Sequence, residues 1–274
     1  MDSRVLQRIA LISILTIIAV FCAPAMAQSP GTLTITGDEL VDEGKYEEAI
    51  SYYDQAIALE PRMAMAWTGK GVALNELGRY AEAKDALEEA IALSPNYAKA
   101  WYQKGIALYG LSEYEQAITA FDTALVIYPE YGYLAYYGKA NSLAALGRYT
   151  EAIPLFDKAL TLEPRYAEPW AMKGNALAAT GDYQGAIAAY DKSLSIEPDY
   201  VLAIKGRDAA AANLTGAAPG TTVSPKPTVT TAPVTTAIRT DTTSPPTTAQ
   251  GIPLSPLMGV AGIAAAVFLF MRKT

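Results

Sequence analysis

The stretch that decides the fold lies in the middle of the chain, where residues 67–95 read WTGKGVALNELGRYAEAKDALEEAIALSP. Its first eleven residues place large and small apolar side chains at helical spacing: Trp67, Gly71 and Leu74. Gly78 then opens a turn, and residues 81–93 carry a second stripe of alanine and aliphatic residues. Pro95 ends this second helix, because proline cannot continue the backbone hydrogen-bond ladder. The stretch therefore predicts two short helices packed side by side.

The two-helix pattern recurs along the chain every 34 or 35 residues. Prolines end five units: Pro61, Pro95, Pro129, Pro164 and Pro198. Tyrosines with the same spacing follow the turn: Tyr46, Tyr80, Tyr114, Tyr149 and Tyr183. Aromatic residues open the first helices of four units: Trp67, Trp101, Tyr136 and Trp170. Small residues recur in step with them and allow two antiparallel helices to approach closely.

This joint recurrence of small, aromatic and proline positions resembles the tetratricopeptide-repeat (TPR) family over about residues 30–213. The resemblance implies an all-α fold, a right-handed α-solenoid of about five helix-turn-helix units plus a C-terminal capping helix. A terminal repeat has an exposed flank, which requires a polar cover. Within a solenoid over 28–213, the units are predicted at about 30–63, 64–97, 98–132, 133–166 and 167–200, with the capping helix at 199–213.

Two places depart from the regular repeat. Leu33 takes the aromatic position of the first unit, and residues 32–36 are rich in β-branched side chains, which are poor helix formers. We therefore expect the first helix to begin late or to fray. One extra residue lies between Pro129 and Tyr136, beside Gly132, and we expect it to loosen that turn.

Residues 1–27 have the three parts of a secretory signal peptide. Arg4 and Arg8 give a positive start, residues 9–21 are apolar, and Ala25-Met26-Ala27 fits a signal-peptidase site. An uncleaved N-terminal anchor is the alternative, whereas a lipoprotein signal at Cys22 is disfavoured by the bulky residue before it.

The C-terminal residues 252–274 are predicted to be a transmembrane anchor or a sorting signal. An uncharged run over 254–271 is just long enough to span a bilayer, and the Arg272-Lys273 pair after it fits the positive-inside rule. Together with Pro253-Leu254-Ser255-Pro256, these parts resemble the tripartite sorting signals of archaeal cell-surface proteins, from which an archaeosortase-type enzyme removes the helix and a lipid replaces it. A plain membrane anchor remains the alternative.

Residues 216–250 form a predicted disordered stalk, because 12 of these 35 residues are Thr, 6 are Pro and 2 are Ser. At its upper edge, Asn213-Leu214-Thr215 is the only glycosylation sequon, which makes Asn213 a glycosylation candidate. The two ends and the stalk together predict an exported chain at the cell surface or the outer face of the cytoplasmic membrane, anchored by its C-terminus.

Composition excludes much catalytic chemistry. The chain has 274 residues, no His and one Cys, so it cannot build a Ser-His-Asp triad, a Cys-His pair or a His-ligated metal site. No cofactor or metal is therefore expected, and no regular calcium loop is present. The net charge of −7 argues against a nucleic-acid partner.

The TPR resemblance implies a concave groove lined by the first helix of each unit, at positions spaced 3, 4 and 3. Its candidate contacts on this chain are Met65, Asn75, Lys99, Tyr102, Tyr109, Tyr137, Asn141 and Asn175. Lys99 and Glu168 are the only charged residues at such positions, so the two-lysine carboxylate clamp of chaperone-binding TPR proteins is absent. These residues indicate a groove for a peptide, since Tyr offers large contact area and Asn hydrogen-bonds an extended backbone. Packing of the tyrosines between neighbouring helices is the alternative.

Two charged rows accompany the repeat. Lysines recur on the first helices at Lys70, Lys104, Lys139 and Lys173. Carboxylates recur on the second helices at Asp54, Glu88, Asp122, Asp157 and Asp191. The lysine row could bind an acidic ligand, but we expect the carboxylates to neutralise it while the lysine stems cover apolar surface.

The sequence thus favours a non-enzymatic scaffold that binds a peptide or protein partner in the TPR groove and is tethered to the membrane by its C-terminal segment. A structural cell-surface component that self-associates laterally is the main alternative. An enzyme acting through carboxylates alone is disfavoured, because the acidic residues fall at repeat positions rather than in one pocket.

Overall fold

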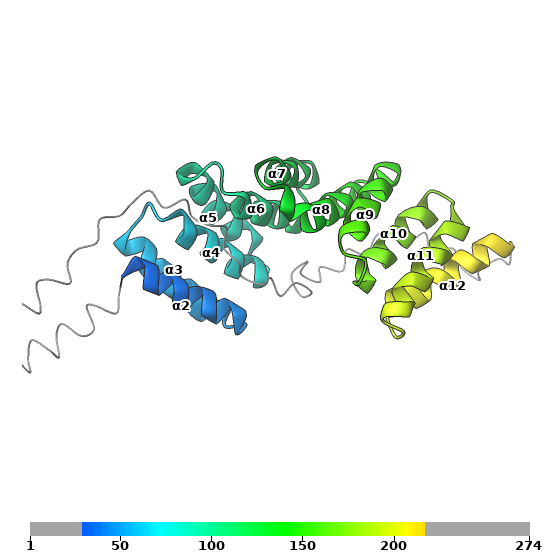
Figure 1. Ribbon diagram of the computed structural model, residues 1–274, viewed down its shortest axis with the longest axis horizontal. Coiled ribbons are helices and arrows are strands. Elements are labelled where there is room, and N and C mark those ends of the chain that lie inside the picture. Colours follow the sequence, from blue (N-terminus) through cyan, green and yellow to red (C-terminus); the bar gives the residue numbers. More distant parts are fainter. Residues whose placement is uncertain (1–28, 217–274) are drawn as a thin grey trace, which may run out of the picture. The chain divides into compact units, whose positions relative to one another are not determined.

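The computed structural model describes residues 29–216, within which eleven α-helices and one short 3-10 helix follow one another and no strand occurs (Figure 1). The helices are α2 (Pro30–Asp42), α3 (Tyr46–Leu59), α4 (Ala64–Glu76), α5 (Tyr80–Leu93), α6 (Ala98–Gly110), α7 (Tyr114–Ile127), η1 (Pro129–Tyr131), α8 (Gly132–Ala145), α9 (Tyr149–Leu162), α10 (Ala167–Ala179), α11 (Tyr183–Ile196) and α12 (Val201–Thr215). The predicted signal peptide and anchor, and the stalk beyond Gly216, lie outside the described residues. No helix between residues 29 and 216 has both the length and the apolar character needed to cross a membrane.

Consecutive helices pack as pairs, from α2 with α3 to α10 with α11, and each second helix also packs on the first helix of the next pair. The first helices contact one another along the chain, as α4 with α6 and α6 with α8, whereas the second helices of residues 29–216 make no such contacts. The first helices therefore form the closely spaced inner layer of the stack. This arrangement confirms the predicted all-α solenoid with its capping helix, α12.

Each pair is closed by a turn whose backbone enters the left-handed region. Glycine occupies this position in four units: Gly44, Gly78, Gly147 and Gly181, with φ between 72° and 86°. Glycine adopts this conformation without steric cost because it has no Cβ. In the third unit the position is taken by Ser112 at φ 63°, the one non-glycine residue with positive φ among those described.

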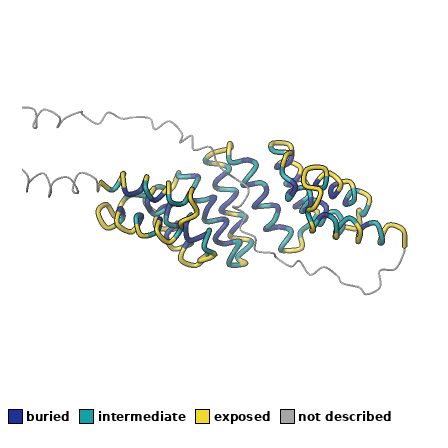
Figure 2. Tube along the Cα trace, turned by 90° about the horizontal axis from the view of Figure 1, so that it is seen from below, coloured by how far each residue is buried: buried dark blue, intermediate teal, exposed yellow. Residues whose placement is uncertain are grey.

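A large side chain of each second helix fills a notch between two first helices. Phe121 of α7 lies against both Gly105 of α6 and Gly138 of α8, and a Cβ on Gly105 would stand 2.6 Å from the Phe121 ring. Phe121 is 1% exposed, and the stripes of buried residues on facing helices are visible in Figure 2. Gly105 therefore lies where the two helices of unit three touch.

Tryptophans connect three of the first helices to the turns before them. The indole nitrogens of Trp67, Trp101 and Trp170 donate to the carbonyls of the prolines six residues earlier, at 2.8–2.9 Å. Tyr136, which takes this position in unit four, has no such bond among the described hydrogen bonds.

Both expected irregularities turn out to be ordered. The first helix does not begin late, because Pro30 occupies its first turn and the Ser29 hydroxyl caps it by accepting from the Thr32 N–H at 3.1 Å. Burial of Leu33 then outweighs the low helix propensity of its β-branched neighbours. The extra residue before Tyr136 does not loosen the turn either, since η1 and the fourteen-residue α8 absorb it.

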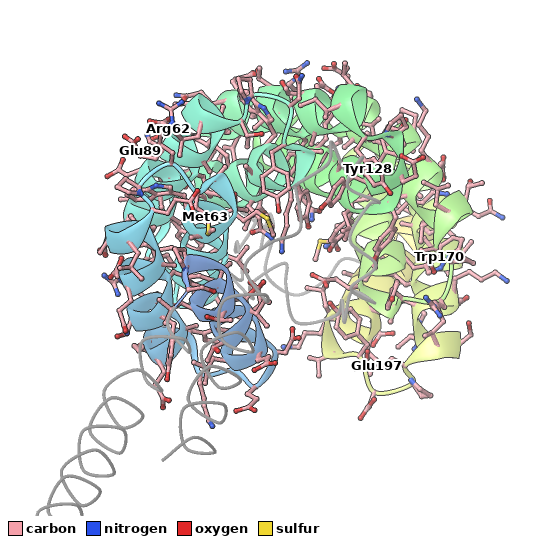
Figure 3. All side chains as sticks on the ribbon, turned by 60° about the vertical axis from the view of Figure 1, so that its left-hand side comes forward. Arg62, Met63, Glu89, Tyr128, Trp170 and Glu197 are labelled. Carbon is pink, nitrogen blue, oxygen red and sulfur yellow. The ribbon has the colours of Figure 1, made fainter. Side chains whose placement is uncertain are left out.

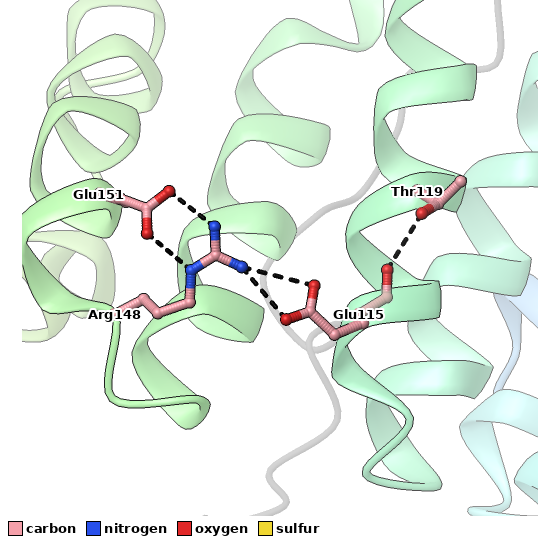
Figure 4. A network of polar contacts seen from close by, with 4 residues as sticks. All are labelled: Glu115, Thr119, Arg148 and Glu151. Carbon is pink, nitrogen blue, oxygen red and sulfur yellow. Dashed lines mark hydrogen bonds and ion pairs between the residues drawn. The ribbon is translucent and has the colours of Figure 1, made fainter.

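Exposed ion pairs join the start of α9 to the start of α7. The Arg148 guanidinium donates to Glu151 at 2.6 Å and 2.7 Å and also to Glu115 of α7 at 3.2 Å (Figure 4). Glu115 in turn accepts from the Thr119 hydroxyl through its backbone carbonyl. Because these charges are solvated, the ion pairs contribute little to the stability of the fold.

Candidate functional site

The predicted groove tyrosines lie on the inner, first-helix layer, but two of them are almost fully buried. Tyr102 is 5% exposed, and its ring contacts Phe121 at 5.8 Å and stacks on Tyr131 at 5.5 Å between ring centroids. Tyr137 is 3% exposed. Tyr109 is half-buried beside a tyrosine of α7. Most of the surface of the Tyr102 and Tyr137 rings is thus buried between helices.

The three predicted asparagines also differ in availability. Asn75 is buried between α4 and α6, where its amide donates to the backbone and side-chain oxygens of Gln103 at 3.0 Å. Asn175 accepts from the Tyr190 hydroxyl at 2.7 Å. Asn141 is half-buried and lies beside the Tyr137 hydroxyl. Asn141 is therefore the amide of the three that is not committed to a bond between helices.

The two remaining groove candidates lie closer to solvent. Met65 in α4 is 58% exposed. Lys99 in α6 is half-buried and forms no ion pair with any residue in the range 29–216. Both side chains belong to the same row of the inner layer, in neighbouring units.

A second aromatic row was not singled out from the sequence. The residue that caps the N-terminus of each first helix from unit three onward is a tyrosine: Tyr97, Tyr131, Tyr166 and Tyr200. The 34-residue period would have revealed this row, since its spacings match those of the prolines. Tyr133 stacks on one member of this row, Tyr166, at 5.4 Å and lies parallel to Tyr137 at 6.3 Å. The inner layer of units three to five is therefore lined with connected tyrosine rings.

Glu168, in the first turn of α10, lies among these rings. Burial raises the pKa of its carboxyl group, the Tyr137 hydroxyl opposes this shift, and the charge of Glu197 adds to it. Burial also raises the pKa of Tyr109 and of Tyr200 to about 12, and the Glu168 charge contributes to both shifts. The charge of Glu168 thus contributes to the titration of tyrosines from several units.

The Tyr137 hydroxyl is the least satisfied polar group of this cluster. Its oxygen is buried and closes no hydrogen bond with any described residue, although Asn141 and Glu168 lie beside it. A buried polar group without a partner costs about 1–3 kcal/mol, and the other such atom among the described residues is the side-chain oxygen of Asn75.

Comparison with known proteins identifies the family. The family model of the tetratricopeptide repeat matches residues 36–98, 76–132 and 137–201, which together make up more than half of the chain. The chain is a tetratricopeptide-repeat protein. No curated protein matches it.

Solved TPR structures share the fold. YrrB, described as a TPR protein with an unusual peptide-binding site, is 23% identical with a TM-score of 0.57, over 69% of this chain and 97% of YrrB. The thermophilic TPR protein TTC0263 from Thermus thermophilus is 21% identical with a TM-score of 0.52, over 68% of this chain and 100% of TTC0263. MamA from Desulfovibrio magneticus RS-1 is 22% identical with a TM-score of 0.56, over 62% of this chain and 96% of MamA. At these identities the likeness concerns the fold.

The lysine row of this TPR array is neutralised, as expected from the sequence. Four ion pairs join it to the carboxylates at 2.5–2.8 Å: Lys70 with Asp54, Lys104 with Glu88, Lys139 with Asp122 and Lys173 with Asp157. Three of these ammonium groups also lie 5.7–5.8 Å from the tryptophan rings of the same helices. A row whose charges are already paired offers little to an acidic ligand.

Two further points bear on the chemistry. Within the described part of the chain, no group of three or more Cys, Asp or Glu residues is placed to hold a metal ion. The sequon residue Asn213 is exposed near the end of α12, where its amide donates to the Ala209 carbonyl at 2.9 Å. Its modification stays a prediction.

Proposed function

We propose that this TPR protein is an extracytoplasmic scaffold that binds a peptide segment of a protein partner along the inner layer of first helices. Scaffolding of protein–protein interactions is consistent with the TPR fold. The observation that carries the peptide proposal is the lining of that layer in units three to five, where tyrosine rings of neighbouring units stack on one another. Export and tethering through the Thr/Pro-rich stalk rest on the sequence of the two ends.

The lining suits an extended peptide for two reasons. The half-buried tyrosine rings, such as those of Tyr133 and Tyr166, supply contact area at low entropic cost, and Asn141 can hydrogen-bond peptide groups. The repeat also sets successive first helices side by side, so equivalent positions recur along the layer as a peptide would run.

Site-specific photocross-linking tests this proposal in the full chain. A photoreactive phenylalanine analogue replaces Met65, which is exposed on the inner layer, and in a matched control it replaces Glu89, which lies on the outer edge of the ribbon in Figure 3. We expect a discrete adduct with a different protein from position 65 and none from position 89.

Two results would contradict the proposal. Equal adducts from both positions would show that the inner layer has no special role. An adduct only with a second copy of the chain would support the lateral self-association that the sequence left open.

A further inference from the structure

One row of the inner layer changes its chemistry from unit to unit. The equivalent positions in units two to five are Met65, Lys99, Leu134 and Glu168. Glu168 is the single carboxylate of this row, and it forms no ion pair with any Lys or Arg between residues 29 and 216. The carboxylates that face the lysine row are paired, so this one differs from the pattern.

The surroundings of Glu168 are drawn from units three and four and from the start of the capping helix. Glu168 lies in the first turn of α10, two residues after Tyr166, whose ring stacks on Tyr133 of α8. Its charge also contributes to the raised pKa values of Tyr109 and Tyr200. Burial raises the pKa of Glu168, which means that its ionised form is poorly hydrated there. A poorly hydrated carboxylate gains from a counter-ion far more than a solvated one does.

The charge around the site selects the sign of the ligand. Glu197 lies close enough to raise the pKa of Glu168 further, so an anionic ligand would meet two negative groups. A cation would meet the Glu168 carboxylate and the faces of tyrosine rings, both of which favour positive charge. Arg165 already shows this chemistry at the rim, where its guanidinium lies 5.5 Å from the Tyr166 ring.

We propose that the cluster around Glu168 is a specificity site for one basic side chain, a lysine or an arginine, of the peptide that the inner layer binds. This inference rests on the proposed function and adds to it the chemistry of the partner. The ammonium or guanidinium group pairs with the Glu168 carboxylate, and its aliphatic stem lies against the tyrosine rings.

The test uses the full chain and four fluorescent heptapeptide pools whose other six positions hold uncharged residues. The central residue is fixed as Arg, Lys, Glu or citrulline, which has the shape of arginine without its charge. We expect the Arg and Lys pools to bind at least about tenfold more tightly than the citrulline pool, since tenfold corresponds to about 1.4 kcal/mol. The Glu pool should bind most weakly.

Two variants connect the preference to the site. Glu168→Gln should reduce the Arg-over-citrulline ratio to about one, because it keeps the size of the side chain and removes its charge. Glu89→Gln, which removes an exposed carboxylate outside the inner layer, should leave the ratio unchanged. A ratio that survives in Glu168→Gln, or that is already one in the native chain, would overturn the inference.

The outcomes separate this inference from the proposed function. Pools that all bind with equal affinity would refute the charge specificity while supporting a peptide groove. Pools that all fail to bind would contradict both proposals.

Discussion

The lysine row and the Glu168 cluster differ in whether their charged groups form ion pairs. Each lysine of the row has a carboxylate partner on the second helix of the preceding unit, and the same pair recurs four times. Glu168 occurs once, forms no ion pair with a described residue, and is surrounded by hydroxyls from other parts of the stack. The repeating charges form ion pairs within the fold, whereas the non-repeating carboxylate of Glu168 has no ion-pair partner among the described residues. This difference directs attention to the non-repeating positions.

Overfilling a repeated contact should give the largest effect. Gly105→Leu places a side chain against Phe121, where even a Cβ has no room. We expect a loss of about 1–3 kcal/mol in the free energy of unfolding and a melting temperature lower by several degrees. Calorimetry measures this, with Val126→Ala, 83% exposed on α7, as the matched control. Equal melting temperatures for the two variants would show that this glycine is not part of the notch.

The turn of unit three should respond in the opposite direction. Ser112 holds a left-handed conformation that glycine holds in the other four turns. Ser112→Gly removes this strain and should stabilise the protein by about 1 kcal/mol, less a contribution from the greater freedom of the unfolded chain. Denaturant titration checks the sign, and a destabilised variant would mean that the serine side chain supplies more than its backbone strain costs.

Removing one member of the lysine row should change stability slightly and peptide binding not at all. Lys104→Ala loses the ion pair with Glu88 and the contact with the Trp101 ring. Such partly exposed interactions contribute about 0.2–1 kcal/mol each. Unfolding and fluorescence anisotropy measure the two effects side by side. A tenfold loss of peptide affinity in this variant would show that a repeated charge also takes part in peptide binding.

Glu168→Gln should have the smallest effect on stability and leave the melting temperature at pH 7 equal to or above that of the native protein. Burial raises the pKa of Glu168 in the folded state, so folding disfavours its ionised form. This penalty is present above the folded-state pKa and disappears below the ordinary pKa of an exposed glutamate. The two melting curves should therefore converge as the pH falls to about 4. A variant less stable at pH 7 would show that the carboxylate supports the fold, for example through the dipole of α10.

The sequence predicts the solenoid well because its determinants are local and periodic. Small residues, prolines and turn tyrosines recur at fixed spacing, and the structure places two helices in every unit. Two local expectations were wrong, since the start of α2 is set by its cap and by burial of Leu33, and since α8 absorbs the inserted residue. Both outcomes depend on helix capping and on packing between units, which helix propensities alone do not describe.

The site was predictable only in part. Helical spacing correctly assigns Tyr102 and Tyr137 to the first-helix layer, but it does not show how far the next unit covers them. The neighbours of Glu168 come from α6, α8 and the start of α12, up to about sixty residues away, so no local pattern joins them. Because Tyr102 and Tyr137 are buried, replacing them by alanine would leave cavities, and Tyr→Phe is the cleaner change.

The affinity of the Arg peptide pool for two double variants tests the central claim most directly. Tyr137→Phe with Glu168→Gln alters the non-repeating cluster, and Lys70→Ala with Lys173→Ala alters the repeating row. Fluorescence anisotropy at fixed ionic strength measures both against the native chain, with helicity checked by circular dichroism. The account predicts at least a tenfold loss for the first double variant and less than a twofold change for the second. The reverse order, with both variants folded, would contradict it.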